Sequence, residues 1–386
     1  MSVLVTDADS RQVLAIIRSL GAKGIAVSAG DSRRWAMGFF SKYCAEKLLY
    51  PSPVENSNLF QRRLLAYLSK RQIDVFMPVS NHILLSISRS LDEFSKFTSV
   101  PIPPFATVMK ALDKSLTLKV AEGIPHPLTF SPEKRSDISK IAKEANYPVV
   151  IKPRLSSGSR GIKYANDATE LVYYFKSTAE RYGIPLVQEY IPGDEMYGVS
   201  MLLNRDAKVR AFFVHKRIRQ FPLTGGPSTY RVSVFDRLLV DLGTKLLKAM
   251  GWYGVAMVEF KIDPRDGMPK LIEVNPRFWG SLSLGIAAGV DFPHLLYKMA
   301  VDGDVQPVLN YKPGVKQRFL LFGDVFHFLA SQDKLKLIPE FLRFYDRDLS
   351  YDIWSSGDPL PALVRLLNGL RYVWSREMWE YAFTRA

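Results

Sequence analysis

Short apolar runs alternate with amphipathic stretches along the first part of the chain. Residues 2–6 form an apolar run, residues 11–20 show helical apolar spacing, and residues 24–29 form a second apolar run. A strand, a helix and a strand within about 30 residues are typical of a βαβ unit. The alternation continues to residue 79 with another predicted helix and strand. We therefore expect a parallel α/β sheet over about the first hundred residues.

A proline-rich stretch at residues 101–104 marks the end of this first region. Beyond it, the pattern predicts one helix over residues 107–121, followed by mixed helices and strands. The most regular of these are a helix over 236–250 and two strands over 254–262 and 269–275. No internal repeat or low-complexity tract interrupts this part of the chain.

The C-terminal region has a different pattern. Residues 341–347 and 363–374 place apolar side chains at helical spacing, with arginines on the other face. Such a helix can lie on a membrane surface, and it can equally dock on the rest of the protein or on a second subunit. We favour docking and leave peripheral membrane contact and a homo-oligomer open.

Composition narrows the class of protein. The 386 residues include one cysteine and five scattered histidines, which excludes an intramolecular disulfide and argues against a zinc site. The start of the chain lacks the pattern of a signal peptide, and no apolar stretch is long enough to span a membrane, so we expect a cytoplasmic protein. The net charge of +14 fits a polyanionic ligand or a nucleic acid. Because no nucleic-acid-binding motif is present, we expect no nucleic-acid partner.

Two acidic residues and an amide lie on adjacent predicted strands. Glu259 belongs to the first strand, whereas Glu273 and Asn275 belong to the second, and residues 264–267 between them carry a strong turn signal. A hairpin with this turn places Glu259 opposite Glu273, with Asn275 on the same face. Oxygen ligands in this arrangement suit Mg²⁺ or Mn²⁺ bridging phosphates. The alternative is a solvated hairpin with exposed acids.

A loop of small residues, 156–161, joins two predicted strands just after Lys152. Small residues let backbone N–H groups fold over an anion. A lysine at the end of a buried strand needs a partner, and a phosphate is a suitable one. The sequence is not that of a P-loop. Taken alone, a Gly/Ser loop is also common in ordinary hairpins.

Two further stretches are candidates for ligand binding. Residues 188–195 form a strand end and a turn whose extended backbone could meet an adenine edge, although alone they fit an ordinary sheet edge. Residues 215–219 are basic and precede a Gly/Ser/Thr loop at 225–229. Arginine forks suit carboxylates, so this cluster could bind a carboxylate or a phosphate. The alternative is a basic strand with a flexible turn.

In this order, the chain resembles the ATP-grasp superfamily, and most closely its carboxylate–amine ligase and carbamoyl-phosphate-synthase-like branch. The resemblance covers roughly residues 1–300. It is carried by Asp113-Lys114, Ile151-Lys152-Pro153, the loop 156–161, the stretch 188–195, Glu259 and Glu273-Val-Asn275-Pro-Arg277. One departure is Gln188, which stands where many relatives have an acid.

The resemblance implies an α/β ATP-grasp fold. Its parts would be a Rossmann-like parallel-sheet (pre-ATP-grasp) domain, two α+β subdomains that clamp ATP, and a helical C-terminal extension. We expect these parts over residues 1–105, 106–185, 186–305 and 306–386.

The resemblance also implies roles for individual residues. The ATP site would contain Lys114, Lys152, Ser156, Ser157, Gly158, Ser159, Gly161, Glu189, Ile191 and Glu195. The magnesium ligands would be Glu259, Glu273 and Asn275, and Lys152 and Arg277 would act on the transferred phosphoryl group. For the second substrate we expect Lys216, Arg217, Arg219, Gly226, Ser228 and Arg277.

The implied activity is an ATP-dependent ligation of a small-molecule carboxylate to an amine, through an acyl phosphate, with release of ADP and phosphate. Two alternatives stay open. One is an ATP-binding regulatory module that has lost catalysis, and the other is a carboxylase-like enzyme that activates bicarbonate. The sequence does not identify the carboxylate or the amine.

Overall fold

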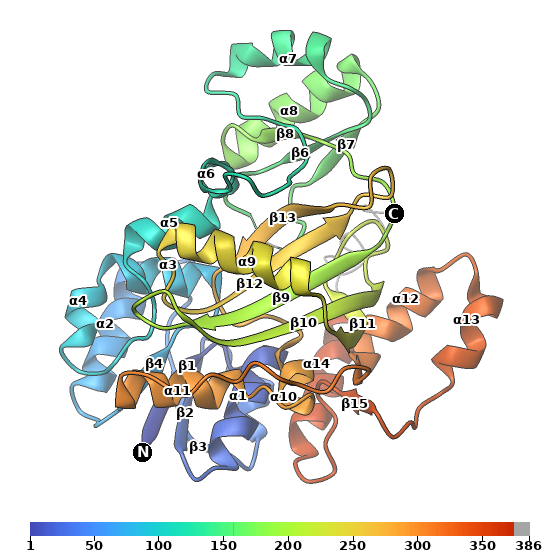
Figure 1. Ribbon diagram of the computed structural model, residues 1–386. Helices are drawn as coiled ribbons and strands as arrows, with labels where there is room; N and C mark the ends of the chain where they lie inside the picture. The colour runs from blue at the N-terminus through green and yellow to red at the C-terminus, as the bar shows by residue number, and fades with distance from the viewer. Residues whose placement is uncertain (157, 374–386) are drawn as a thin grey trace.

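The computed structural model describes residues 1–156 and 158–373. The predicted nucleotide residue Ser157 and the end of the predicted C-terminal helix, from Trp374, lie outside the described residues. Figure 1 shows three sheets along the chain: a blue N-terminal sheet, a green sheet in the upper lobe and a long central sheet.

The first sheet is parallel, as the alternation of strands and helices predicts. Its strand order is β3-β2-β1-β4. The strands are β1 (Ser2–Thr6), β2 (Ala26–Asp31), β3 (Cys44–Leu49) and β4 (Val75–Met77). Helix α1 (Arg11–Gly21) covers one face, and the other face packs against α2 (Ser57–Leu68), α3 (Asn81–Arg89) and α4 (Leu91–Ser95). A short 3-10 helix, Met37–Phe40, precedes β3.

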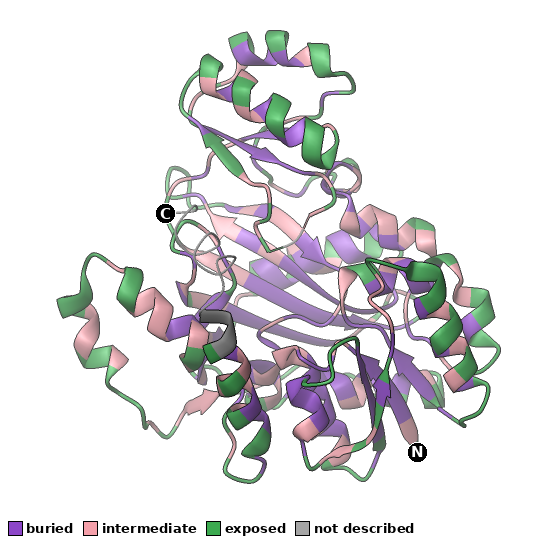
Figure 2. Ribbon diagram, turned by 180° about the vertical axis from the view of Figure 1, so that it is seen from behind, coloured by how far each residue is buried: buried purple, intermediate pink, exposed green. Residues whose placement is uncertain are grey.

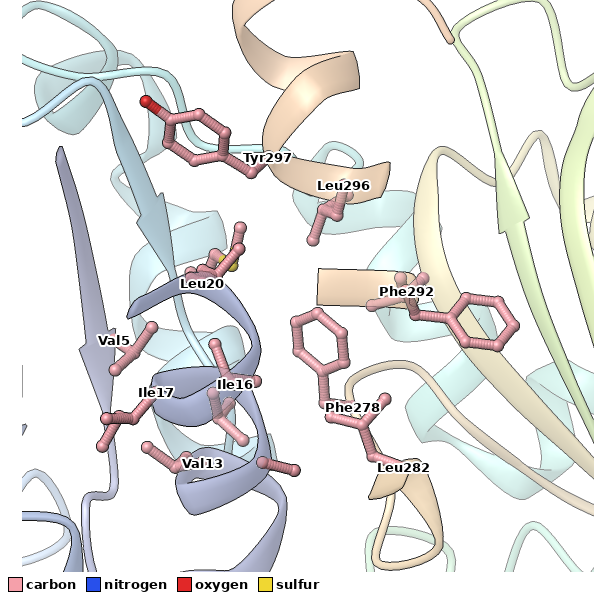
Figure 3. Close-up of a cluster of buried hydrophobic side chains, with 14 of the residues drawn as sticks. Val5, Val13, Ile16, Ile17, Leu20, Phe278, Leu282, Phe292, Leu296 and Tyr297 are labelled. Carbon is pink, nitrogen blue, oxygen red and sulfur yellow. The ribbon is translucent and has the colours of Figure 1, made fainter. Parts of the chain in front are cut away.

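The face of this sheet that carries α1 also packs against a later part of the chain. In Figure 3, Ile16 and Leu20 of α1 face Phe278 and Leu296, which lie more than 250 positions later in the sequence. These later side chains belong to the region of α10 (Leu282–Ala287) and α11 (Phe292–Asp302). This shared core fixes the N-terminal sheet against the central one.

The upper lobe contains a four-stranded antiparallel sheet in the order β5-β8-β6-β7. Its strands are β5 (Thr129–Phe130), β6 (Val149–Lys152), β7 (Lys163–Ala165) and β8 (Leu186–Glu189). Helices α7 (Ile138–Glu144) and α8 (Ala168–Tyr182) cover one face, through the core that includes Leu171 and Phe175. The other face is left for the central sheet (Figure 1).

The central sheet has seven strands in the order β13-β12-β9-β10-β11-β14-β15. They are β9 (Met196–Leu203), β10 (Val209–Gln220), β11 (Ser228–Val234), β12 (Gly254–Ile262), β13 (Pro269–Asn275), β14 (Lys316–Arg318) and β15 (Leu349–Tyr351). Helix α9 (Arg237–Met250) covers one face with leucines at helical spacing. Figure 2 shows most of these strands as buried.

The structure differs from the predicted helix over residues 107–121. Two helices replace it, α5 (Phe105–Leu112) and α6 (Lys114–Val120), because Asp113 between them has an extended backbone (ψ 110°). The Asp113 side chain accepts a hydrogen bond from the backbone N–H of Ser115 at 2.9 Å and so caps the second helix. The break matters for the site described below.

The C-terminal region contains strands as well as the expected helices. Strands β14 and β15 extend the central sheet, and β15 runs parallel to β14. Between and after them lie a kinked segment, Leu320–Asp324, in which Leu321 and Phe322 have non-helical backbone angles, and the helices α12 (Val325–Ala330), α13 (Lys334–Phe341) and α14 (Leu360–Val373). Helix α14 packs beside the N-terminal sheet, whereas α12 and α13 project outward (Figure 1). The boundaries of the four predicted domains stay a prediction.

None of the helices within residues 1–156 and 158–373 is both long and apolar enough to cross a bilayer.

Candidate active site

A cavity of about 1640 Å³ lies where the sheets of the upper lobe, the central sheet and the N-terminal sheet meet. This is larger than the roughly 300–1,000 Å³ that one small ligand usually occupies. Most of the predicted site residues line it. They are Lys114, Lys152, Ser156, Gly158, Ser159, Glu189, Ile191, Arg217, Gly226, Ser228, Glu259, Glu273, Asn275 and Arg277.

The hairpin of β12 and β13 has the register that the turn signal predicts. Glu259 pairs directly with Glu273. Asn275, two residues further along β13, pairs with Met257 and lies on the same face as Glu273. The Asn275 amide nitrogen lies 3.2 Å from Glu259 Oε1 and 3.5 Å from Glu273 Oε1. The strands therefore bring two carboxylates and one amide together on the wall of the cavity.

The two carboxylates have few cations near them. Arg217 approaches Glu259 Oε2 at 3.4 Å, and Lys114 approaches Glu273 Oε2 at 3.5 Å. Burial raises the pKa of Glu259; Arg217 opposes this rise, and the charge of Glu273 adds to it. Among the described residues, these two long contacts are the ion pairs that reach the facing carboxylates, with Arg277 nearby, and the arrangement favours an additional positive charge between them.

The donor set fits a divalent cation such as Mg²⁺. Carboxylate and amide oxygens are hard ligands, and Mg²⁺ needs only one or two protein carboxylates when phosphates complete its shell. Within the part of the chain that the structure describes, no three His, Cys, Asp or Glu side chains gather at one place. A cation here would therefore rest on Glu259 and Glu273 together with phosphate oxygens. Asn275 presents its amide nitrogen to both carboxylates and its oxygen to Arg277, so it would have to turn its amide to become a ligand.

Lys152 ends strand β6 and is buried. Its ammonium group donates a hydrogen bond of 2.6 Å to Gln188 Oε1, and Gln188 in turn donates to Thr129 at 2.8 Å. Burial, together with the charge of Lys114, lowers the pKa of Lys152 to about 8. Gln188 is neutral, and among the described residues no carboxylate forms an ion pair with Lys152, although the charge of Glu273 opposes the lowering of its pKa. The lysine is therefore suited to an anionic ligand.

The helix break at Asp113 decides where Lys114 points. As the first residue of α6, Lys114 turns into the cavity, and its ammonium group donates to the carbonyl of Ser156 at 2.8 Å. Arg154 holds the Asp113 carboxylate at 2.7 Å. A continuous helix would have left Lys114 as one more surface lysine.

The loop 156–161 has the backbone freedom that its small residues predict. Gly158, Ser159 and Gly161 all have a positive φ, and Ser159 adopts it (60°) although it carries a Cβ. At Gly161 a Cβ would lie 2.8 Å from Pro153 and Tyr182, so only glycine fits there. Gly158 and Ser159 line the cavity, whereas Gly161 shapes the loop from outside it.

In the stretch 188–195, Glu189 and Ile191 line the cavity, but the Glu189 carboxylate and the Ile191 carbonyl already accept hydrogen bonds from other residues of the protein. The Glu189 carboxylate accepts from Arg265 at 2.5 Å and from the backbone N–H of Leu128 at 3.1 Å. The carbonyl of Ile191 accepts from Lys261 at 2.7 Å. Adenine contacts through the backbone of this stretch therefore stay a prediction.

Glu195 and Lys216 do not line the cavity. Their side chains form an ion pair with each other, and Tyr197 donates to Glu195 at 2.6 Å. Successive residues of a strand point to opposite faces, so Lys216 points away from the face that carries Arg217. The expected roles of Lys216 in the substrate site and of Glu195 in the ATP site do not fit this placement.

Arg219 is also placed elsewhere than expected. A β-bulge in β10 shifts the register between Arg217 and Arg219, so Arg219 pairs with Tyr230. Its buried guanidinium binds Asp324 at 2.7 Å and Glu340 at 3.1 Å. We therefore correct the expectation that Arg219 contacts a substrate: its contacts hold the C-terminal segment to the sheet.

Arg277 lies where β13 meets the N-terminal sheet. It donates to Asn81 Oδ1 at 2.7 Å, to the carbonyl of Phe278 at 2.8 Å and to Asn275 Oδ1 at 3.1 Å. Burial lowers its pKa, and the charges of Glu273 and Glu259 oppose that shift. The arginine is thus fixed in position beside the two carboxylates.

Sequence reasoning missed the far half of the cavity. Its wall includes Trp35, which follows β2, and two side chains of the C-terminal segment, Phe322 and Phe326. Helix α14 contributes Asn368, whose amide donates to the carbonyl of Trp35 at 2.8 Å. No motif marks these residues, because they meet only through the tertiary packing.

Comparisons with known proteins agree with this geometry. The ATP-grasp domain family matches residues 111–281. A D-alanine–D-alanine ligase from Carboxydothermus hydrogenoformans is 31% identical over 183 residues, which is 43% of this chain and 58% of that protein. The chain spans 40 to 61% of the length of three curated relatives that it matches.

Two solved structures have a similar fold. The Campylobacter jejuni biotin carboxylase, in complex with β-γ-ATP, is similar with a TM-score of 0.69 at 19% identity, over 82% of this chain and 74% of that one. The biotin carboxylase domain of the Hydrogenobacter thermophilus 2-oxoglutarate carboxylase, in complex with MgADP, ADP and bicarbonate, has a TM-score of 0.68 at 18% identity, over 82% and 73%. Residues 111–281 thus form an ATP-grasp domain, and the chain has the fold of these two solved structures.

Proposed function

We propose that this protein is an ATP-dependent ligase that phosphorylates a carboxylate and couples the resulting acyl phosphate to an amine. The observation that carries the proposal is the direct pairing of Glu259 with Glu273 at one cavity that also holds Lys114, Lys152 and Arg277. Phosphoryl transfer depends on positioning and on neutralising charge, and this set supplies both.

Each basic residue has a place in this scheme. Lys152 and Lys114 flank the loop 156–161 and would hold phosphate oxygens of ATP, because neither ammonium group is fully neutralised within the protein. Mg²⁺, when bound on Glu259, Glu273 and Asn275, would neutralise further phosphate oxygens. Arg277 would steady the phosphoryl group in transfer, since its side chain is already fixed beside those acids.

The reaction takes place in two steps, phosphoryl transfer to the carboxylate and then attack by the amine. A carboxylate oxygen bonds to the γ-phosphorus as the bond to the bridging oxygen of ADP breaks. The amine nitrogen then bonds to the acyl carbon, phosphate leaves and the nitrogen loses a proton. The acyl phosphate must be kept from water. The loop 221–228 reaches the upper lobe, where Tyr164 donates to the carbonyl of Thr224 at 3.2 Å, and this contact closes one side of the cavity.

A carboxylase-like activity on bicarbonate is the second candidate, because two structures of similar fold are biotin carboxylase proteins. The size of the cavity favours a larger acid than bicarbonate.

The test measures release of ADP and phosphate from MgATP. One arm contains pools of carboxylic acids and a separate arm contains bicarbonate. Each arm is run with and without pools of amines. The ligase proposal expects release that needs an acid pool, rises with an amine pool and stops when EDTA removes the metal. Release with bicarbonate alone would support the carboxylase. Tight MgATP binding without release in any arm would favour a regulatory module that has lost catalysis.

A further inference from the structure

The cavity continues beyond the residues that would hold ATP, and its far wall is aromatic. Phe221, at the end of β10, lies against Phe326 of α12 with ring centroids 5.5 Å apart, and Phe326 lies 5.8 Å from Phe322. All three rings are half-buried, and all three line the cavity. They come from two segments that are 100 residues apart, and together they make one apolar surface, called here the aromatic wall.

The conformation of Phe322 is unusual for a residue with a side chain. Its φ is 61°, in the left-handed region that phenylalanine rarely adopts. Such strain gathers at functional sites, where the surrounding structure holds it in place. Here, the ring is held over Gly369 of α14, where any Cβ would come within 2.0 Å of two ring carbons. The glycine makes room for the ring.

The aromatic wall is fixed rather than loosely attached. Asp324, two residues after Phe322, binds Arg318 at 2.6 Å and Arg219 at 2.7 Å. Helix α14 is tied to the N-terminal region through Asp358, which binds Arg18 at 2.9 Å. A wall held by buried ion pairs can select a ligand by shape, because it cannot readily move aside.

Arg217 connects the aromatic wall to the two carboxylates of the hairpin. One side of its guanidinium meets Glu259 at 3.4 Å, and the other donates to the carbonyl of Gly226 at 3.1 Å, in the loop that Phe221 begins. A carboxylate beside Arg217 and Arg277 would therefore have its body directed along the loop toward the aromatic wall.

The charge of the cavity points to an acid as the second ligand. Among the described residues that line it, eleven are basic and five are acidic; two of the basic residues, Arg11 and Arg231, are paired with Asp352, which does not line the cavity. MgATP carries only about two negative charges, so it leaves part of this positive charge unmatched. Arg34 is exposed, lines the cavity and has no ion pair among the described residues. An anionic second substrate fits this excess.

We propose that the acid activated by this protein carries a bulky, preferably aromatic, body, and that Phe322 and Phe326 select it. This inference rests on the proposed ligase function and adds its substrate class.

The experiment compares acids that differ only by a phenyl ring. ADP release from MgATP is measured with 3-phenylpropanoate against propanoate, and with phenylalanine against alanine. Binding of the same four acids to the MgADP complex is measured by calorimetry. Wild-type protein should prefer the phenyl member of at least one pair about tenfold or more, in release and in binding. Phe322→Ala should abolish most of that preference.

Two control variants separate selection from folding. Leu329→Ala removes an exposed side chain of α12 that does not line the cavity, and it should keep the preference. Gly369→Ala should displace the Phe322 ring and lower the preference, although alanine favours the helix. Gly357→Ala, whose nearest neighbour is 4.0 Å away, should leave it unchanged.

The outcomes distinguish the two proposals. Equal use of phenyl and small acids, or a preference that survives Phe322→Ala, overturns the aromatic selection and leaves the ligase standing. Binding of a phenyl acid that depends on Phe322, without ADP release from any acid, supports the binding site and removes the ligase. If neither release nor binding responds to the ring, the selection proposal fails.

Discussion

Two pairs of carboxylates lie along the central sheet, one half-buried and one buried, and they are built in opposite ways. At one edge, Glu259 and Glu273 face each other across two strands, with one arginine and one lysine at 3.4 and 3.5 Å. Near the other edge, Asp324 and Asp352 each lie between two arginines, at 2.6 to 2.8 Å for three of the four contacts. The first pair faces the cavity and the second pair is enclosed.

The difference separates a binding site from a structural anchor. A buried carboxylate between two arginines has its charge matched within the protein, and losing it leaves the arginines buried without a partner. Two carboxylates that face each other repel, and they are matched only when a further cation joins them. Removing a charge should therefore have opposite consequences for stability at the two edges.

The largest expected effect is on catalysis at the first edge. Glu273→Gln removes one charge of the facing pair while keeping the shape of the side chain. We expect ADP release to fall about a thousandfold, because the metal and the phosphates lose a ligand. The melting temperature should stay the same or rise, because repulsion with Glu259 is relieved. The exposed Glu180→Gln is the control; full activity in Glu273→Gln would contradict the metal assignment.

At the other edge, the expected effect is on folding. Asp324→Asn leaves the buried Arg318 without its carboxylate and leaves Arg219 paired with the more exposed Glu340, so we expect the free energy of unfolding to fall by about 3–5 kcal/mol. Denaturant unfolding measures it. Asp333→Asn, an exposed aspartate that pairs with Lys336 at 3.1 Å, should change it by less than about 1 kcal/mol. Similar losses in both variants would mean that Asp324 is no anchor.

Lys152 extends the comparison to the binding of ATP. It is a buried cation that forms no ion pair with a carboxylate among the described residues. Lys152→Met should weaken MgATP binding about ten- to a hundredfold, as measured by calorimetry. Lys176→Met, on the exposed surface of α8, should not change it. Unchanged nucleotide affinity in Lys152→Met would rule out its role.

The same lysine gives binding a pH dependence. Its pKa is lowered from 10.5 to about 8, so it loses its charge above pH 8 and MgATP binding should weaken about tenfold by pH 9. Lys152→Met should remove this dependence. In the free protein, the native state binds fewer protons than the unfolded chain between pH 8 and 10.5. The destabilisation from this buried charge is therefore full below pH 8 and is relieved as the pH rises toward 10.5.

The smallest expected effect concerns the helix break. Asp113→Ala removes the cap of α6 and the partner of Arg154, so we expect a loss of about 1–2 kcal/mol in stability. The KM for ATP should rise about two- to fivefold, since Lys114 follows directly. Asp167→Ala, which removes the cap of α8 at 2.9 Å, is the matched control. It should lose similar stability without changing KM.

Much of the fold could be predicted from the chain because its signals are local. The parallel N-terminal sheet follows from apolar runs that alternate with amphipathic helices, and the β12–β13 hairpin follows from its turn residues. The helix over 107–121 was predicted wrongly as one piece. The apolar spacing of this stretch continues through Asp113. The break there is favoured by the Asp113 side chain, which accepts from the backbone N–H of Ser115 and so caps α6, and by the ion pair of Asp113 with Arg154.

The candidate site also contains residues whose positions could be predicted from the sequence and residues whose positions could not. The facing acids and Lys152 could be predicted because strand alternation places them. Arg219 could not, because a β-bulge changes its direction, and a bulge depends on how two strands settle against each other.

The sequence by itself thus determined the order of the strands along the chain, the hairpin that pairs Glu259 with Glu273, and the small-residue loop after Lys152, since each depends on residues close together in the chain. Only the tertiary structure decided that the C-terminal segment joins the central sheet and that its aromatic side chains complete the cavity. Those contacts link residues hundreds of positions apart, and their geometry depends on buried ion pairs and shared cores that no local pattern records.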